Sequence, residues 1–105
     1  MSRREKIEAM LVEDPTDVFL RYSLAMELQQ EGRHEESLAR FRELQTEDPP
    51  HVPAFFMAGQ QLASLGRSDE ARDVLRNGID QARAQGDTHA AAEMSEFLAS
   101  LGSSA

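Results

Sequence analysis

The chain has 105 residues, a net charge of −8 from 19 acidic and 11 basic side chains, and no cysteine. A chain of this length is expected to form one domain, and its acidic excess gives no cationic face for the phosphates of a nucleic acid. The absence of cysteine excludes disulfides, thiol catalysis and thiolate metal sites.

Apolar periodicity predicts six helices, and no segment shows the alternation of apolar and polar residues that is typical of strands. The first expected helix, 2–13, ends before Pro15, and the second, 17–31, has leucines spaced four residues apart. Gly32 follows the second helix, and glycine most readily adopts the positive φ angle that ends a helix.

The third expected helix, 34–47, ends before Pro49, because the residue before a proline is pushed out of the α region. The fourth, 51–65, lies in a segment from Pro49 to Gly66 that has no charged residue. The three prolines, two glutamines and one serine of this segment make it too polar to span a membrane. We therefore expect a helix that is buried on most of its surface.

The fifth expected helix, 68–84, begins just after Gly66, which should end the fourth helix as Gly32 ends the second. A polar loop then leads to the sixth helix, 88–101. Asp87 is expected to cap the first turn of this last helix.

The sequence repeats itself at an interval of 34 residues, since EGRHEESLARF at 31–41 returns as LGRSDEARDVL at 65–75. A shorter copy follows, with LASLG at 62–66 returning at 98–102. Each repeat contains two expected helices joined at a glycine. A helical hairpin cannot bury its apolar face alone, so we expect the hairpins to stack and share a core.

The spacing of large and small residues resembles the tetratricopeptide repeat (TPR), a helix-turn-helix unit of about 34 residues. Two positions depart from that pattern, because Arg21 stands where a bulky aromatic is usual and Arg83 where a closing proline is usual. The small matching residues should let the two helices of a hairpin approach closely. The matching positions are Arg21, Leu24, Ala25, Leu28, Ser37, Phe41 and Pro49, then Phe55, Ala58, Gly59, Leu62, Ala71 and Leu75, then Ala91, Met94, Ser95 and Leu98.

This resemblance implies an all-α fold, a right-handed superhelical stack of TPR hairpins with about six helices, in a single TPR-like domain over 1–105. Residues 1–15 would form a leading half-repeat helix and 16–49 the first repeat. Residues 50–84 would form the second repeat and 85–105 a capping helix of the first-helix type.

No catalytic, cofactor-binding or metal-binding residue is expected, and the chain should not be an enzyme. Two acid pairs, Glu35–Glu36 and Asp69–Glu70, could suggest a divalent cation, but in the first turn of a helix we expect them to complement the helix dipole. The three histidines lie at helix starts or loop ends and are expected to be solvated rather than ligands or bases. They are His34, His51 and His89.

The resemblance also implies that a partner lies in a concave groove formed by the first helix of each repeat. The positions carried over to this chain are Phe19, Tyr22, Met26, Gln29, Phe56, Gln60, Ala63, Ser64, Ala92 and Glu96, with His89 as a further candidate. Some similar proteins hold a partner's C-terminal carboxylate with a cationic clamp, but at the clamp positions this chain has no cation. We expect a non-enzymatic module that binds a peptide or helix of a partner protein. Alternatively, Phe19, Tyr22 and Phe56 simply pack on neighbouring helices.

A second interpretation is a self-assembling structural or scaffold protein. The last helix is expected to leave Met94, Phe97 and Leu101 uncovered, and monomers seldom expose such an apolar patch. Pairing of two last helices would give a homodimer. Alternatively, Phe97 folds back over the preceding helix and caps the array.

The charged N-terminal residues lack the apolar segment of a secretory signal, so we expect a cytoplasmic protein with a protein or peptide partner and no membrane contact. One lysine against ten arginines, together with the acidic excess, also fits a salt-rich cytoplasm.

Overall fold

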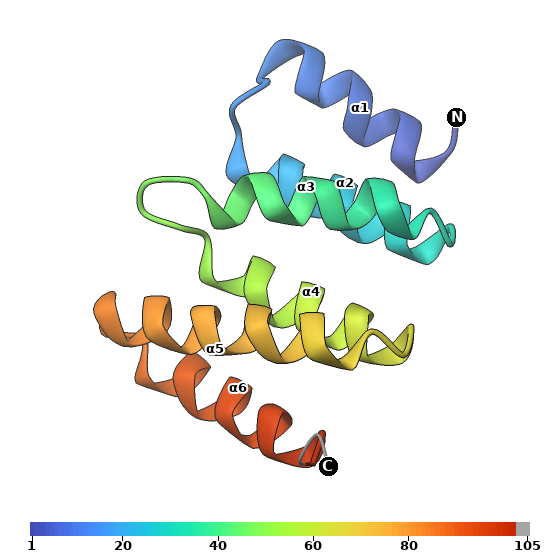
Figure 1. Cartoon of the computed structure of the whole chain (residues 1–105). Helices are drawn as coiled ribbons and strands as arrows, with labels where there is room; N and C mark the ends of the chain where they lie inside the picture. Colours follow the sequence, from blue (N-terminus) through green and yellow to red (C-terminus); the bar gives the residue numbers. More distant parts are fainter. Residues whose placement is uncertain (103–105) are drawn as a thin grey trace. The chain divides into compact units, whose positions relative to one another are not determined.

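The computed structural model describes residues 1–102, and these form six α-helices and no strand (Figure 1). The helices are α1 (Arg3–Glu13), α2 (Val18–Gln30), α3 (His34–Gln45), α4 (Val52–Ser64), α5 (Ser68–Ala84) and α6 (Thr88–Ser100). The expected boundaries agree with these to within two residues. The prediction of an all-α fold is confirmed.

The chain divides into two compact units, and each is described by itself. Unit 1 is Met1–His51 and contains α1 to α3, and unit 2 begins at Val52 and contains α4 to α6. The division falls close to the boundary expected between the first and second repeats. That the whole chain forms one domain stays a prediction.

A glycine with positive φ follows each of α2, α4 and α5. The sequence predicted this for Gly32 and Gly66. Gly32 has a φ angle of 77°, and the next backbone N–H, from Arg33, donates to the carbonyl of Leu28 at 2.9 Å. Gly66 and Gly86 repeat this conformation with the same φ angle. Such a turn satisfies carbonyls that the helix leaves without partners and so fixes where the chain reverses.

At the start of α6, the predicted cap is also confirmed. The side chain of Asp87 accepts a hydrogen bond from the backbone N–H of Ala90 at 3.0 Å. This bond satisfies one of the free N–H groups in the first turn.

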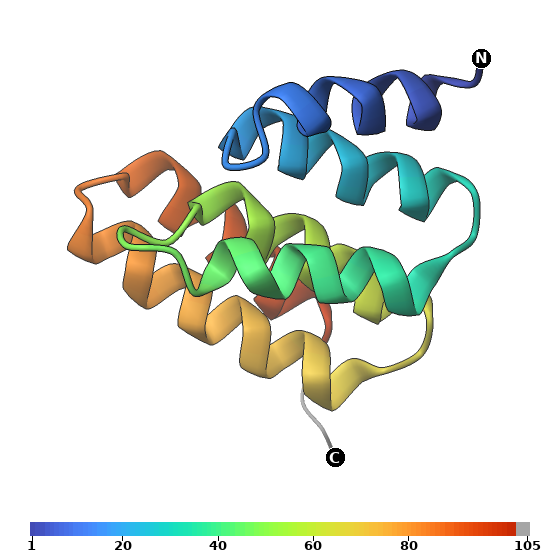
Figure 2. The same cartoon turned by 90° about the horizontal axis from the view of Figure 1, so that it is seen from above.

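In unit 1, α2 and α3 form an antiparallel hairpin, and α1 packs on α2 (Figures 1 and 2). Ile7 of α1 meets Leu24 and Leu28 of α2 in a small apolar cluster. The hairpin itself closes at small residues, since the buried Ser37 hydroxyl donates to the carbonyl of Ala25 at 2.7 Å. The predicted close approach of α2 and α3 is therefore present.

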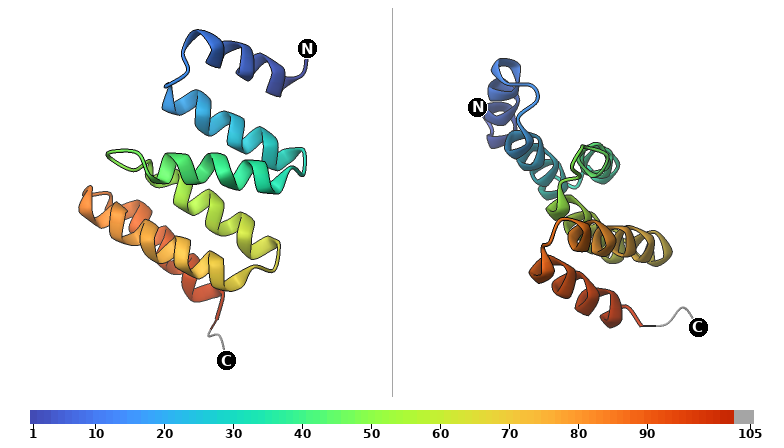
Figure 3. Two further views of the ribbon diagram at one scale, coloured as in Figure 1. Left: turned by 45° about the horizontal axis from the view of Figure 1, so that its top comes forward. Right: turned by 90° about the vertical axis from the view of Figure 1, so that its left-hand side faces the viewer.

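In unit 2, α4 and α5 form the second hairpin, and α6 runs beside α5 and touches α4 (Figure 3). A Cβ atom added at Gly59 of α4 would lie 2.6 Å from a side-chain carbon of Leu75 on α5. A Cβ atom at Gly78 of α5 would lie 2.5 Å from the Cβ of Phe55 and 2.7 Å from the sulfur of Met94. Both glycines therefore stand where neighbouring helices have no room for a side chain.

The predicted apolar patch on α6 is wrong for Met94, which is 0 % exposed. Its side chain enters the core of unit 2 because Gly78 leaves space for it. Phe97 and Leu101, the other two members of that patch, are partly buried against the same core.

Truncation of the largest buried side chains should be costly. Phe41 is fully buried and Leu24 is 6 % exposed, so Phe41→Ala and Leu24→Ala should each lower the free energy of unfolding by about 2–5 kcal/mol through the cavity left behind. Urea unfolding followed by circular dichroism measures this. Val12→Ala, at a side chain that is 78 % exposed, is the control and should change stability by less than about 0.5 kcal/mol.

Gly78→Ala separates helix propensity from packing. Alanine favours a helix by about 1 kcal/mol over glycine, yet the added methyl group would overlap Phe55 and Met94, so we expect a net loss of about 1–3 kcal/mol. The exposed neighbour Asn77 lies on the same helix, and Asn77→Ala should be neutral or stabilising. A Gly78→Ala chain that is more stable than the parent would show that this contact is loose.

Candidate functional site

The predicted partner-binding residues lie on α2 of unit 1 and on α4 and α6 of unit 2. None of these ten positions, from Phe19 to Glu96, is buried. That the two groups together form one groove stays a prediction, and the surfaces of each unit are described separately.

On α2, Phe19 and Tyr22 differ in their surroundings. Phe19 is 73 % exposed, whereas the ring of Tyr22 packs edge-on against Phe41 and His51, with centroids 5.8 and 5.1 Å away. Burial raises the pKa of the Tyr22 phenol and lowers the pKa of the His51 imidazole. Tyr22 therefore packs on neighbouring residues, as the alternative interpretation predicts. The expectation that His51 is solvated is wrong, because its ring is partly buried against Tyr22.

Polar side chains surround Met26 on α2. Met26 lines a hollow of about 420 Å³ between α1 and α2, together with Ser23 and Gln30. An ion pair of 2.9 Å between Arg3 and Glu27 crosses it. Gln29 is partly exposed beside it on the same helix.

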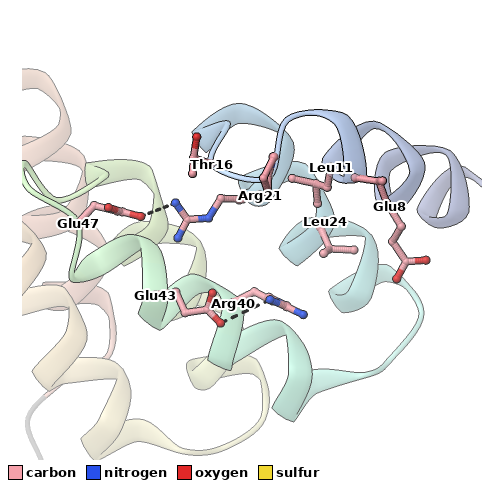
Figure 4. A pocket seen from close by; sticks show the side chains of 10 residues that line it. Glu8, Leu11, Thr16, Arg21, Leu24, Arg40, Glu43 and Glu47 are labelled. Carbon is pink, nitrogen blue, oxygen red and sulfur yellow. Dashed lines mark hydrogen bonds and ion pairs between the residues drawn. The ribbon is translucent and has the colours of Figure 1, made fainter.

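Another hollow of unit 1 was not predicted from the sequence, and it has a volume of about 580 Å³ (Figure 4). Leu11 of α1 and Leu24 of α2 form its apolar floor. Arg21 reaches Glu47 across one side in an ion pair. The one sequence signal was Arg21 itself, which stands where the resemblance expects a bulky aromatic side chain.

A further ion pair of 3.5 Å, between Arg40 and Glu43 of α3, also borders this hollow (Figure 4). Both arginines that line it are thus paired with carboxylates. Glu8 is a third carboxylate of the lining, and it pairs with Arg4 at 3.0 Å. The hollow therefore has apolar surface at its base and paired charges at its rim.

In unit 2, a hollow of about 330 Å³ between α4 and α6 brings together residues from both sequence-based interpretations. Phe56 and Glu96 were predicted to bind a partner, and Phe97 was predicted to mediate self-association or to cap the preceding helix. The rings of Phe56 and Phe97 meet edge-to-face, with centroids 6.0 Å apart and planes at 63°. Phe97 therefore belongs to the same surface as Phe56.

The two charged residues that line this hollow of unit 2 are both glutamates. Helix α4 contains no charged residue, and α6 contains Glu93 and Glu96 but no lysine or arginine. His89 is the one basic side chain on α6, and its Nε2 lies 3.2 Å from Glu93. The remaining predicted partner-binding residues of unit 2 are uncharged. Gln60 and Ala63 are partly exposed, and Ser64 and Ala92 are exposed.

Both acid pairs, at the starts of α3 and α5, include a glutamate that forms an ion pair with an arginine. Glu36 lies 2.8 Å from Arg33, and Glu70 lies 2.6 Å from Arg67. Across residues 1–102, no group of three or more potential ligands is placed to hold a metal ion. Within the same range, no helix has the length and apolar character needed to cross a membrane.

Comparison with known proteins places the hairpins in a family. A family model described as tetratricopeptide repeat matches residues 18–43 and 52–77. These ranges cover α2 with most of α3, and α4 with the first part of α5.

Two solved structures are similar over most of the chain. One is a tetratricopeptide repeat domain protein from Salinibacter ruber, with 32% identity, a TM-score of 0.78, and coverage of 84% of this chain and 89% of that chain. The other is a protein from Bordetella parapertussis, with 26% identity, a TM-score of 0.81, and coverage of 96% and 88%.

A curated relative shares a shorter segment. The cytochrome c-type biogenesis protein CycH of Rhizobium meliloti (strain 1021) is 37% identical over 59 residues, which are 56% of this chain. The chain spans only 16% of the length of that relative.

Tetratricopeptide repeats in general mediate protein–protein interactions, and their fold is a scaffold that is usually non-enzymatic. Each matched range lies within one of the two helical hairpins, and the Salinibacter ruber domain aligns over most of both chains. The chain belongs to the tetratricopeptide repeat family.

Proposed function

We propose that this chain is a non-enzymatic interaction module that binds a peptide or helix of a partner protein through the exposed side chains of α2, α4 and α6. The observation that carries the proposal is the aromatic hollow of unit 2, where Phe56 and Phe97 meet beside two carboxylates. Aromatic rings give a large contact area at low entropic cost, and they are enriched among residues that dominate binding energy.

The exposure of Phe19 supports the same proposal for unit 1. A phenylalanine that is 73 % exposed contributes little to folding, whereas a partner that covers it would gain apolar burial. The partner segment would therefore carry apolar anchors, and some positive charge to complement the carboxylates of α6.

The alternative of a homodimer through α6 has less support. It was based on an apolar patch that included Met94, and Met94 is buried. The two remaining members, Phe97 and Leu101, are already partly covered by the core of their own unit.

Peptides selected from a displayed library on the immobilised chain test this function. Phe19→Ala combined with Phe56→Ala should weaken the selected peptides at least about tenfold, a loss of about 1.4 kcal/mol. Fluorescence anisotropy gives the dissociation constants, and circular dichroism checks that the double variant remains helical.

The matched control removes apolar surface elsewhere, on α1. Met10→Ala combined with Val12→Ala should leave peptide binding unchanged, since both side chains are exposed on a helix outside the proposed surface. Val12 also lines the hollow of Figure 4. If this control weakens binding while Phe19→Ala with Phe56→Ala does not, the peptide contacts that hollow and the proposed surface is wrong.

Recognition should not depend on a free C-terminal carboxylate. The positions of the family's clamp are held here by Tyr22, Met26, Gln60, Ala92 and Glu96, none of which is cationic. Amidation of a selected peptide's C-terminus should therefore leave its affinity within about twofold, as measured by the same anisotropy assay. A large loss on amidation would place an unrecognised cation at the site.

A further inference from the structure

The hollow between α4 and α6 combines aromatic rings and carboxylates in one small space. Glu93, Glu96, Phe97 and Ser100 follow the spacing i, i+3, i+4, i+7, so they lie on one face of α6. Phe56 of α4 closes the other side through its edge-to-face contact with Phe97. We propose that this hollow binds a guanidinium group, the arginine side chain of a partner polypeptide, an inference that deepens and rests on the proposed function.

The size of the hollow suits one side chain rather than a whole helix. Its volume of about 330 Å³ is at the low end for pockets that hold small molecules. A partner helix or strand would thus lie across the surface and insert a single side chain here.

The local charge favours a cation. Within the part of the chain that the structure describes, Glu93 lies 3.2 Å from His89, and neither Glu93 nor Glu96 pairs with an arginine or lysine. Other acids of unit 2 do have such partners, for example Asp69 with Arg72 at 2.9 Å. Two carboxylates next to low-dielectric aromatic surface attract a positive charge more strongly than the same groups in open water.

The aromatic pair favours a guanidinium over an ammonium group. A guanidinium is flat, is weakly hydrated, and stacks on aromatic faces while its N–H groups still point outward in the plane. Those N–H groups can then donate to Glu93 and Glu96, and charge-assisted bonds of this kind are the stronger ones. Ser100 donates its hydroxyl proton to the carbonyl of Phe97 at 2.6 Å, so its oxygen is left to accept a further N–H.

Capped single amino acids test the subsite directly in the full chain. N-acetyl-arginine amide, added at low salt, should shift the NMR signals of the Phe56 ring and of residues 93–100. N-acetyl-citrulline amide has the same shape without the charge and should cause no such shift, and N-acetyl-lysine amide should bind several-fold more weakly.

Two charge-matched variants identify the carboxylates. Glu93→Gln with Glu96→Gln should weaken arginine amide at least about tenfold, and these side chains are exposed, so the fold should be kept. Asp73→Asn with Asp80→Asn removes the same charge from exposed positions on α5 and should leave the affinity within about twofold. Equal loss in both variants would mean that only the net charge attracts the probe, and it would overturn the inference.

A selected peptide separates this inference from the proposed function. If Phe56→Ala weakens a peptide while replacement of each of its arginines by citrulline does not, the surface binds partners and the guanidinium subsite is wrong. If arginine amide shifts the NMR signals of this hollow while Phe19→Ala with Phe56→Ala leaves peptide affinity unchanged, the subsite is supported and the proposed function is wrong. The third outcome has two parts. Replacement of the peptide's arginines by citrulline lowers its affinity at least about tenfold, and the Glu93→Gln, Glu96→Gln chain binds the unchanged peptide equally weakly. This outcome supports both the proposed function and the guanidinium subsite.

Discussion

The close approach of helices at positions without a side chain is the constraint on which unit 2 depends. Gly59 faces Leu75, and Gly78 faces Phe55 and Met94. Because Gly78 lets Met94 sink into the core, α6 lies close enough to α4 for Phe97, three residues later, to reach Phe56. The aromatic surface proposed to bind a partner is thus a product of packing at a glycine.

Much of the fold could be predicted from the sequence because its signals are local. Gly32, Gly66 and Asp87 act on the turn in which they stand, so a single sequence is enough to place the helix ends. The stripe of leucines along α2 depends only on the helical period. A repeat of these signals then indicates a repeat of the hairpin.

The site was harder to predict because it depends on which helices touch. Met94 and Phe97 both look like members of an exposed stripe, and only the gap at Gly78 decides that Met94 turns inward. The sequence around a glycine inside a helix does not indicate which side chain of another helix packs against it. The hollow that Arg21 lines was hard to predict for the same reason. An arginine in place of the usual aromatic shows that the sequence departs from the repeat pattern, but it does not show that a hollow results.

Tyr22 gives the molecule a spectroscopic property of its own. The chain has one tyrosine and no tryptophan, so its intrinsic emission comes from a single ring that packs on Phe41 and His51 within unit 1. Emission therefore reports on unit 1 alone, whereas far-ultraviolet dichroism sums the helices of both units. A mismatch between the two signals on heating would show that the hairpins of this small repeat protein melt one after the other.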